Sequence, residues 1–257
     1  MKKILTMGMI TSSLLISQVN ADFLRVEMGA GTWDYKASGT MSYRDNATNA
    51  SGDYRSSEPS NNDMYVWMLI KHPVPLVPNL RVEYTKVRDS GSAFGRFEDF
   101  TTDGITVDAK YELKQYDIIP YYNILDNLMW TTIDLGIDIK IIDASYYAYN
   151  VKVGNNPIPT TYHDQDTVAL PLAYARGRVE IPGTNIGLEA DGKYVTYDGS
   201  TVYDLRAKVD YSFDFGVVEP GLEVGYRVQK FDLKTDDDKK QLNVDFSGFY
   251  AGLMLRF

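Results

Sequence analysis

The segment "VYDLRAKVDYSF", residues 202–213, alternates from Tyr203 onward between apolar or aromatic and polar side chains. One face is apolar or aromatic: Tyr203, Leu205, Ala207, Val209, Tyr211 and Phe213. The opposite face is polar and mostly charged: Asp204, Arg206, Lys208, Asp210 and Ser212. A repeat of two residues indicates a β-strand whose two faces meet different surroundings.

The same alternation recurs along the chain and predicts an all-β protein with about ten strands. The predicted strands cover residues 23–35, 62–71, 79–88, 105–118, 130–142, 166–181, 185–197, 201–213, 218–233 and 242–257. No segment longer than a turn or two has the periodicity of a helix. Pro171 interrupts the sixth strand and predicts either a bulge there or a later strand start, near Leu172.

Alternation also occurs in soluble sandwiches, but strand length and connections favour apolar faces that point outward into lipid. The predicted strands span about 10–15 residues, whereas soluble strands average about 5–6 and a tilted membrane strand needs about 9–11. The odd-numbered connections include three long polar segments, at 36–61, 89–104 and 143–165, and the even-numbered ones are short. Outer-membrane barrels have long extracellular loops and short periplasmic turns. We therefore predict a transmembrane up-and-down antiparallel β-barrel.

The two ends of the sequence agree with an exported barrel. Residues 1–21 carry Lys2 and Lys3, an apolar stretch and a small residue at Ala21, the layout of a cleaved signal peptide. The barrel domain then covers 22–257. The final segment "GFYAGLMLRF" is a strand with an apolar face at Phe249, Leu253, Leu255 and Phe257. Its resemblance to bacterial outer-membrane proteins implies that this terminal aromatic strand is the signal for the outer-membrane insertion machinery.

Composition excludes several classes of function. The net charge of -9 argues against a nucleic-acid partner, because phosphate binding needs a basic surface. The chain has no cysteine and therefore no disulfide, thiol nucleophile or thiolate metal site. We predict no cofactor, and we expect outer-membrane lipid and the insertion machinery as partners; the sequence does not predict an oligomeric state.

Three motifs carry a closer resemblance, which covers nearly the whole mature chain. They are "MGAGTW" (28–33), "HPVPLVPNLRVEY" (72–84) and "YYNILDN" (121–127). With them the chain resembles the GlyGly-type outer membrane β-barrel family of proteobacteria, although Gly29-Ala30-Gly31 departs from an uninterrupted glycine pair. The resemblance implies fold and outer-membrane location, and no activity. We interpret the proline-rich and Asn/Asp-rich motifs as turns.

The polar faces carry both charge signs in near balance, which predicts a lumen filled by interlocked salt bridges. The predicted network contains Lys110, Glu112, Asp134, Asp138, Arg176, Arg178, Asp191, Lys193, Asp204, Arg206, Lys208, Asp210, Glu223 and Arg227. A ten-stranded barrel is too narrow for an open porin. The favoured function is a structural or surface-interaction barrel without a catalytic role, and the alternative is a narrow channel for small polar solutes or ions.

Two further hypotheses concern one predicted outer loop. His163 lies in "YHDQD" beside Asp164 and Asp166, and an Asp–His pair could activate water in a rim hydrolase. The two carboxylates could also contribute to a calcium site, although they are far fewer than a full ligand set. The other histidine, His72, lies in the predicted periplasmic turn, at the wrong end for rim chemistry.

Overall fold

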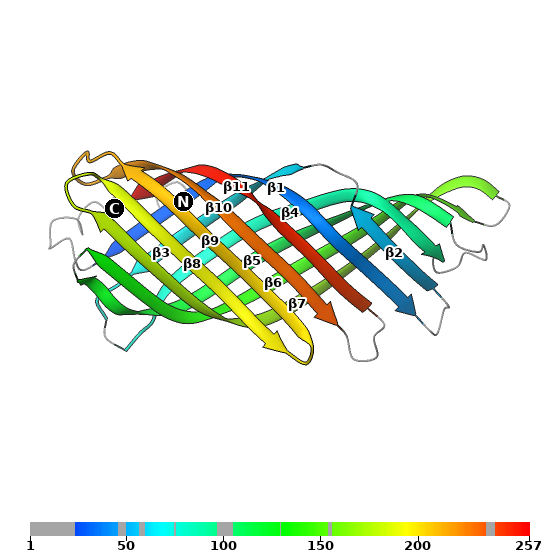
Figure 1. Ribbon diagram of the computed structural model, residues 1–257, viewed down its shortest axis with the longest axis horizontal. Helices are drawn as coiled ribbons and strands as arrows, with labels where there is room; N and C mark the ends of the chain where they lie inside the picture. The colour runs from blue at the N-terminus through cyan, green and yellow to red at the C-terminus, as the bar shows by residue number, and fades with distance from the viewer. Residues whose placement is uncertain are drawn as a thin grey trace, which may run out of the picture.

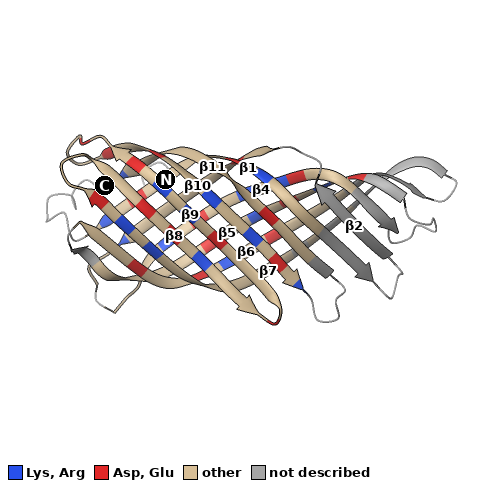
Figure 2. Cartoon of the chain, viewed as in Figure 1, with Lys and Arg blue, Asp and Glu red and all other residues tan. Residues whose placement is uncertain are grey.

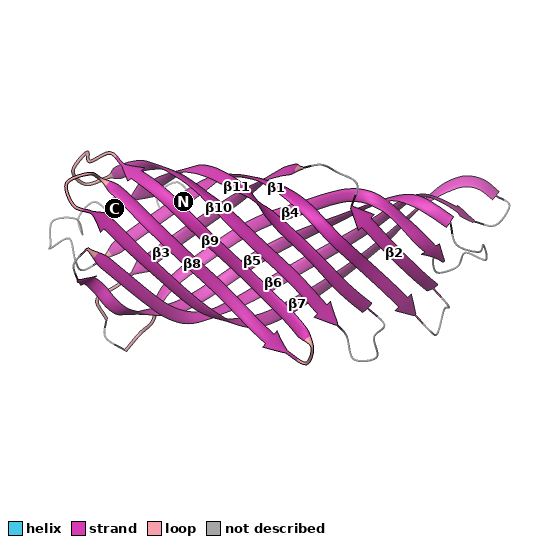
Figure 3. Cartoon of the chain, in the orientation of Figure 1, coloured by secondary structure: helices cyan, strands magenta, loops and turns pink. Residues whose placement is uncertain are grey.

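Strands make up almost all of the computed structural model, which describes residues 24–45, 50–56, 60–74, 76–96, 105–128, 130–153, 156–234 and 240–257 (Figure 3). In chain order the strands are β1 (Arg25–Asp45), β2 (Ala50–Ser56), β3 (Asn61–Lys71), β4 (Asn79–Arg96), β5 (Ile105–Leu128), β6 (Thr131–Val153), β7 (Asn156–Ile181), β8 (Ile186–Tyr197), β9 (Ser200–Ser212), β10 (Glu219–Lys234) and β11 (Lys240–Arg256). The predicted signal peptide, residues 1–21, lies outside the described residues.

The strands form one antiparallel sheet that closes on itself, because β11 pairs with β1 from Glu27↔Arg256 to Tyr43↔Lys240 (Figure 1). The short β2 and the longer β3 occupy a single position between β1 and β4. The segment β2 pairs with the distal parts of β1 and β4, and β3 pairs with their proximal parts. The barrel therefore has ten strand positions, which confirms the predicted fold.

The described residues contain no helix long and apolar enough to cross a membrane. The start of β1 and the end of β11 lie at the same end of the barrel, as the pair Glu27↔Arg256 shows. Short turns follow β3, β5, β7 and β9 at that end. It is therefore the periplasmic end by the rule for outer-membrane barrels, and the opposite end is extracellular.

The predicted long loops are mostly strand. The polar segments at 36–61, 89–104 and 143–165 extend β1, β4, β6 and β7 and supply β2, and pairing continues along them, for example to Gly95↔Ile105. The prediction was wrong because a strand that projects beyond the lipid has a solvated outer face, so its polar composition resembles that of a loop. One real turn is Asp198-Gly199 between β8 and β9, with φ of 48° and 74°, as a tight hairpin requires.

Two other boundary predictions were wrong. The motif 121–127 belongs to β5, with Tyr121 buried and Tyr122 exposed, and only irregular register near Asn123 and Leu125 marks its approach to the turn. Pro171 lies inside β7 without a bulge, paired with Ile139. It is tolerated because β8 pairs with β7 only from Ala173 onward, which leaves an unpaired edge beside the proline.

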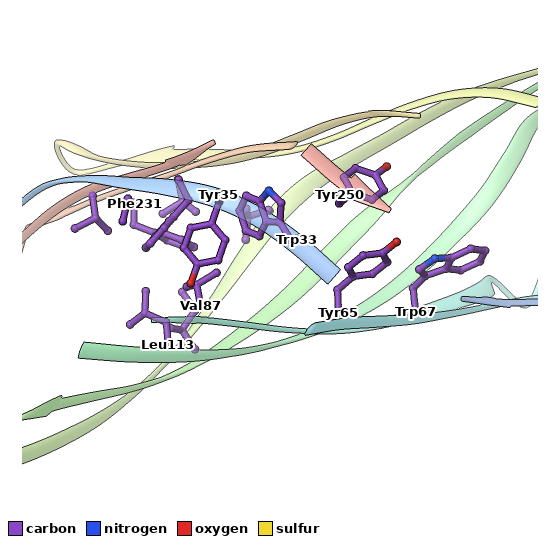
Figure 4. Close-up of a cluster of buried hydrophobic side chains, with 14 of the residues drawn as sticks. Trp33, Tyr35, Tyr65, Trp67, Val87, Leu113, Phe231 and Tyr250 are labelled. Atoms are coloured by element: carbon purple, nitrogen blue, oxygen red, sulfur yellow. The ribbon is translucent and has the colours of Figure 1, made fainter. Parts of the chain in front are cut away.

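The interior has two layers. The part towards the extracellular end holds buried apolar and aromatic side chains, among them Tyr35, Leu113 and Phe231 (Figure 4), and Phe246 belongs to the same cluster. The part nearer the periplasm holds most of the buried charged side chains. Figure 2 marks the charged residues along the strands. The outward face changes in the opposite sense, from lipid-facing apolar residues to charged residues that meet water. On β5, for example, the outward residues change from Tyr116 and Ile118 to Lys110, Glu112 and Lys114, so this strand inverts its polarity at the membrane surface.

Candidate functional site

The charged layer is built from the inward positions of eight strands, where backbone pairing places polar side chains on alternate residues. Eight cations are buried there: Arg81, Lys140, Arg176, Arg178, Lys193, Arg206, Lys208 and Arg227. Ten carboxylates are buried with them: Glu27, Glu83, Asp117, Asp134, Asp138, Glu189, Asp191, Asp204, Asp210 and Glu223. At the periplasmic mouth the half-buried Arg25 and Arg256 both approach Glu27 and bring the two signs into balance.

At the periplasmic mouth, Arg178 forms a bidentate pair with Asp210. Its Nη1 and Nη2 atoms lie 2.6 and 2.9 Å from the two carboxylate oxygens. Deeper in the lumen, Arg176 joins Asp134 at 2.6 Å to Glu189 at 2.8 Å. Planar guanidinium groups with two carboxylate partners fix both geometry and charge. Interlocked pairs from β1, β6, β7, β8 and β9 therefore close the lumen just inside the mouth.

In the middle of the lumen, aromatic side chains take part in the network. The carboxylate of Glu223 accepts hydrogen bonds from Tyr65 Oη at 2.7 Å and Trp67 Nε1 at 2.9 Å, while Lys208 Nζ lies 2.9 Å away. The Lys208 ammonium also lies 4.5 Å from the centre of the Trp67 ring. Sequence reasoning missed these aromatic residues. They share the inward face of β3 with Asp63 and Leu69 and alternate with the outward Met64, Val66 and Met68, and this alternation was the available signal.

Lys193 is at the centre of the part of the charged layer that lies furthest from the periplasm. Its Nζ atom lies 2.7 Å from Glu83 and 2.8 Å from Asp117, and its side chain is fully buried. Asp117 also pairs with Lys140 at 2.6 Å. These ion pairs connect β4, β5, β6 and β8 across the barrel, so this lysine stabilises walls that are distant in sequence.

Asp204 has the most complete set of partners in the same layer. Arg227 donates to both of its oxygens, at 2.9 and 2.6 Å, and Gln229 Nε2 donates at 2.8 Å. Arg206 lies one inward position further along β9 and pairs with Asp191 at 2.7 Å and Glu83 at 2.6 Å. The structure thus brings together most of the predicted network residues.

Two predicted members, Lys110 and Glu112, were placed on the wrong face. On β5 the buried residues are Tyr111, Leu113 and the polar Gln115 and Asp117 that follow, so Lys110 and Glu112 point out of the barrel. The prediction assumed that the membrane section of this strand was 105–118. The strand instead continues to Leu128, and its first part lies beyond the lipid, where the polarity of the faces is inverted.

Little free space remains inside the charged layer. The cavity among Trp67, Arg206, Lys208, Arg227 and Tyr250 measures about 10 Å³, room for about one water molecule. A larger cavity of about 390 Å³ lies at the periplasmic mouth, lined by Trp130, Arg178 and Arg256 among others. The barrel therefore has an open periplasmic vestibule, and side chains fill the charged layer next to it among the described residues.

The two histidines lie outside the lumen. His72 is in the periplasmic turn, where its Nε2 atom lies 3.0 Å from the carbonyl oxygen of Pro78. His163 is exposed on β7, and its ring stacks on Tyr147 with 4.5 Å between centroids. The side chains of Asp164 and Asp166 are not among those that the structure describes, so the hydrolase and calcium hypotheses there stay predictions.

The terminal strand has the predicted orientation. Phe249, Leu253, Leu255 and Phe257 all project away from the lumen and are exposed on the surface of the barrel. They alternate with the buried Tyr250 and Met254. This face therefore meets lipid.

Comparison with known proteins identifies the fold and leaves the family open. No family model and no curated protein matches the chain. Among solved structures, the outer membrane protease OmpT from Escherichia coli matches with a TM-score of 0.53 at 10% identity, over 94% of this chain and 99% of that one. The translocator domain of the autotransporter NalP from Neisseria meningitidis matches with a TM-score of 0.40 at 10% identity, over 100% and 98%. The chain thus has the fold of outer-membrane β-barrels.

Asp138 differs from the other buried carboxylates, and this difference predicts an unusual mutational result. Neither of its oxygens accepts a hydrogen bond from the described residues, and its ion pair with Lys193 is long, at 4.0 Å. Removing its charge should remove a desolvation cost and little attraction. We expect Asp138→Asn to change the free energy of unfolding by less than about 1 kcal/mol, or to stabilise the barrel.

The matched comparison is Asp204→Asn, which has the same change of chemistry at a carboxylate with three close donor contacts. It should cost about 3–5 kcal/mol, since Arg227 would keep a buried and unpaired charge. Urea unfolding followed by tryptophan fluorescence in lipid vesicles measures both. Equal losses in the two variants would contradict this account of Asp138.

Proposed function

We propose that this protein is an integral outer membrane β-barrel with a sealed lumen, which acts as a structural and surface-presenting barrel and does not conduct solutes. The main observation that supports this proposal is the filled interior of the barrel. A salt-bridged layer that leaves about 10 Å³ of free space is stacked on an apolar and aromatic layer. A hydrated ion would have to displace both layers. Membership of the GlyGly-type barrel family, suggested by its motifs, belongs to the same proposal.

The proposed surface function resides in the part of the barrel that extends beyond the lipid. There β4, β5, β6 and β7 continue as paired strands (Figure 1). The described outer faces of this part carry polar residues such as Lys110, Glu112 and Gln165. A rigid extension presents a fixed surface at lower entropic cost than mobile loops of the same length. We further propose that the lipid-facing side of β11 is what the insertion machinery recognises during assembly.

We also propose that the barrel has no catalytic role. His72 is engaged in a periplasmic turn, and the exposed His163 packs on Tyr147. A general base must lie within hydrogen-bond reach of the proton that it removes, beside a place for the substrate. The described part of the lumen contains no histidine, and the cavity within the charged layer, beside Glu189, Asp191 and Glu223, measures only about 10 Å³.

Conductance of the refolded protein in a planar bilayer tests the proposal. A sample that migrates differently in a gel before and after boiling, and that floats with liposomes, should give no stable current steps. Reproducible steps would instead establish the narrow channel. In that case charge reversal at Arg206 or Asp210, which lie in the charged layer, should change the ion selectivity.

A further inference from the structure

The outer wall of β4 and β5 carries an aromatic pair directly followed by a lysine pair. Tyr84 is paired in register with Tyr116, and their ring centroids are 5.2 Å apart. Tyrosine at such positions marks the boundary between lipid and water. The next outward-facing row pairs Lys86 with Lys114, whose side chains are 26% and 38% exposed. This row lies two residues further out, about 7 Å along the strand.

Like charges directly opposite each other destabilise a sheet unless an anion compensates them. Glu112 supplies part of that compensation, since its carboxylate lies 2.8 Å from Lys86 Nζ and 3.5 Å from Lys114 Nζ. Burial raises the pKa of Glu112, but the hydrogen bond from Lys86 and the charges of Lys86, Lys114 and Lys110 outweigh it and lower the pKa. Lys86 and Lys114 therefore share this carboxylate, and the charge of Lys110 adds to the attraction.

Two other acidic groups lie near this row. Glu112 and, less strongly, Asp143, which is paired in register with Lys114, raise the pKa of this lysine by their charge, and Asp143 also accepts a hydrogen bond from Gln165 at 2.9 Å. Asp108 lies two residues beyond Lys110, further from the membrane. The basic row, defined as Lys86, Lys110 and Lys114, thus has two lysines in contact with a single carboxylate close to the lipid boundary.

The wall formed by β10 and β11 is built differently at the corresponding place. There the aromatic contact is Tyr226 with Phe249, at 4.9 Å. Four residues beyond Tyr226, Lys230 is paired in register with Asp245, and their charged groups lie 3.5 Å apart. This lysine has its own counter-ion on the neighbouring strand. The wall formed by β10 and β11 therefore lacks the opposed lysines of the basic row.

We propose that the basic row binds the phosphate groups of a lipid in the outer leaflet of the membrane. The row projects on the lipid-facing side of the wall, next to the tyrosines that fix its depth at the level of lipid headgroups. Lysine ammonium groups are strong partners for phosphate oxygens. A phosphate between Lys86 and Lys114 would neutralise the opposed charges and release Glu112 to Lys110. The acyl chains of the same lipid would lie along Tyr84, Tyr116 and Ile118.

Titration of lipid A into nanodiscs of phosphatidylcholine that contain the folded, full-length barrel tests this proposal. We expect bisphosphorylated lipid A to bind the unaltered protein, and Lys86→Gln/Lys114→Gln to weaken its apparent affinity about tenfold, given the usual contribution of basic residues near a membrane surface. Lys110→Gln should weaken it less. The control Lys230→Gln, which removes a lysine with its own carboxylate, should leave the affinity unchanged.

Two comparisons separate the lipid from other sources of phosphate. Lipid A without its phosphates should bind the unaltered protein about as weakly as bisphosphorylated lipid A binds the double variant. Inorganic phosphate at the same concentration should not compete. Equal affinities of the double variant and the unaltered protein, or equal losses in Lys230→Gln, would overturn the proposal. So would full competition by inorganic phosphate, which would reveal a general anion site.

Discussion

Lys193→Met should cost about 3–5 kcal/mol of unfolding free energy, the loss expected when one partner of a buried ion pair is removed. The ammonium group of Lys193 lies between Glu83 and Asp117, at 2.7 and 2.8 Å, with Asp204 at 3.8 Å and Asp138 at 4.0 Å. Methionine matches the length of the side chain, so packing is largely preserved. The lost stability would therefore measure the repulsion among carboxylates that face one another without a cation.

Urea unfolding in vesicles measures the unfolding free energy of this variant. Two further variants show whether electrostatic repulsion causes the loss. Lys230→Met removes a partly exposed ion pair and should cost about 1 kcal/mol or less. Adding Asp138→Asn to Lys193→Met should recover part of the stability, because it removes one of the crowded negative charges. If the double variant were as unstable as Lys193→Met alone, electrostatic repulsion would not be the cause of the loss.

Phe246→Ala should destabilise the extracellular half by about 3–5 kcal/mol, the usual cost of replacing a buried phenylalanine with alanine. Phe246 is fully buried, and its ring contacts those of Trp33, Tyr35, Tyr111 and Phe231, with centroid distances of 5.6–6.5 Å. These four aromatic residues come from β1, β5 and β10. Rigid strands limit how far the walls can collapse into the space that the ring leaves.

The same unfolding assay measures this loss, and Tyr197→Ala is its control. Tyr197 is 80% exposed next to the β8–β9 turn, so its removal should change stability by no more than about 0.5 kcal/mol. The fluorescence of Trp33, whose ring centroid lies 6.5 Å from that of Phe246, adds a local signal. A Phe246→Ala barrel as stable as the Tyr197 variant would show that the aromatic layer contributes little.

Sequence reasoning succeeded where a strand crosses the lipid along most of its length. In β9 the alternation of Leu205 and Val209 with Arg206 and Lys208 predicted both faces correctly, because the outer face meets lipid along most of the strand. In β5 the surroundings of the outer face change midway from water to lipid. Lys110 lies outside the lipid on the outer face, and Asp117 lies inside the barrel, although both are charged. Alternation cannot show where that change occurs.

The partners within the lumen were beyond sequence reasoning for a different reason. Lys193 contacts Glu83, which lies 110 residues away in the sequence, across the barrel. Such a pairing depends on closure, strand tilt and register together, and each is set by many residues. The balance of the two signs was visible in the sequence, whereas the incomplete set of partners around Asp138 was not.

The seam between β1 and β11 has a consequence for the order of assembly. Its ladder joins Glu27 to Arg256, near opposite ends of the chain, and it removes the last two free edges of the sheet. Contacts between residues so distant in sequence form slowly, because the intervening chain must be ordered first. Until they form, the nascent sheet exposes two edges that can pair with other chains. Cooperativity is therefore concentrated at the final step, and an interrupted chain that ends before β11 should aggregate rather than persist as a smaller barrel.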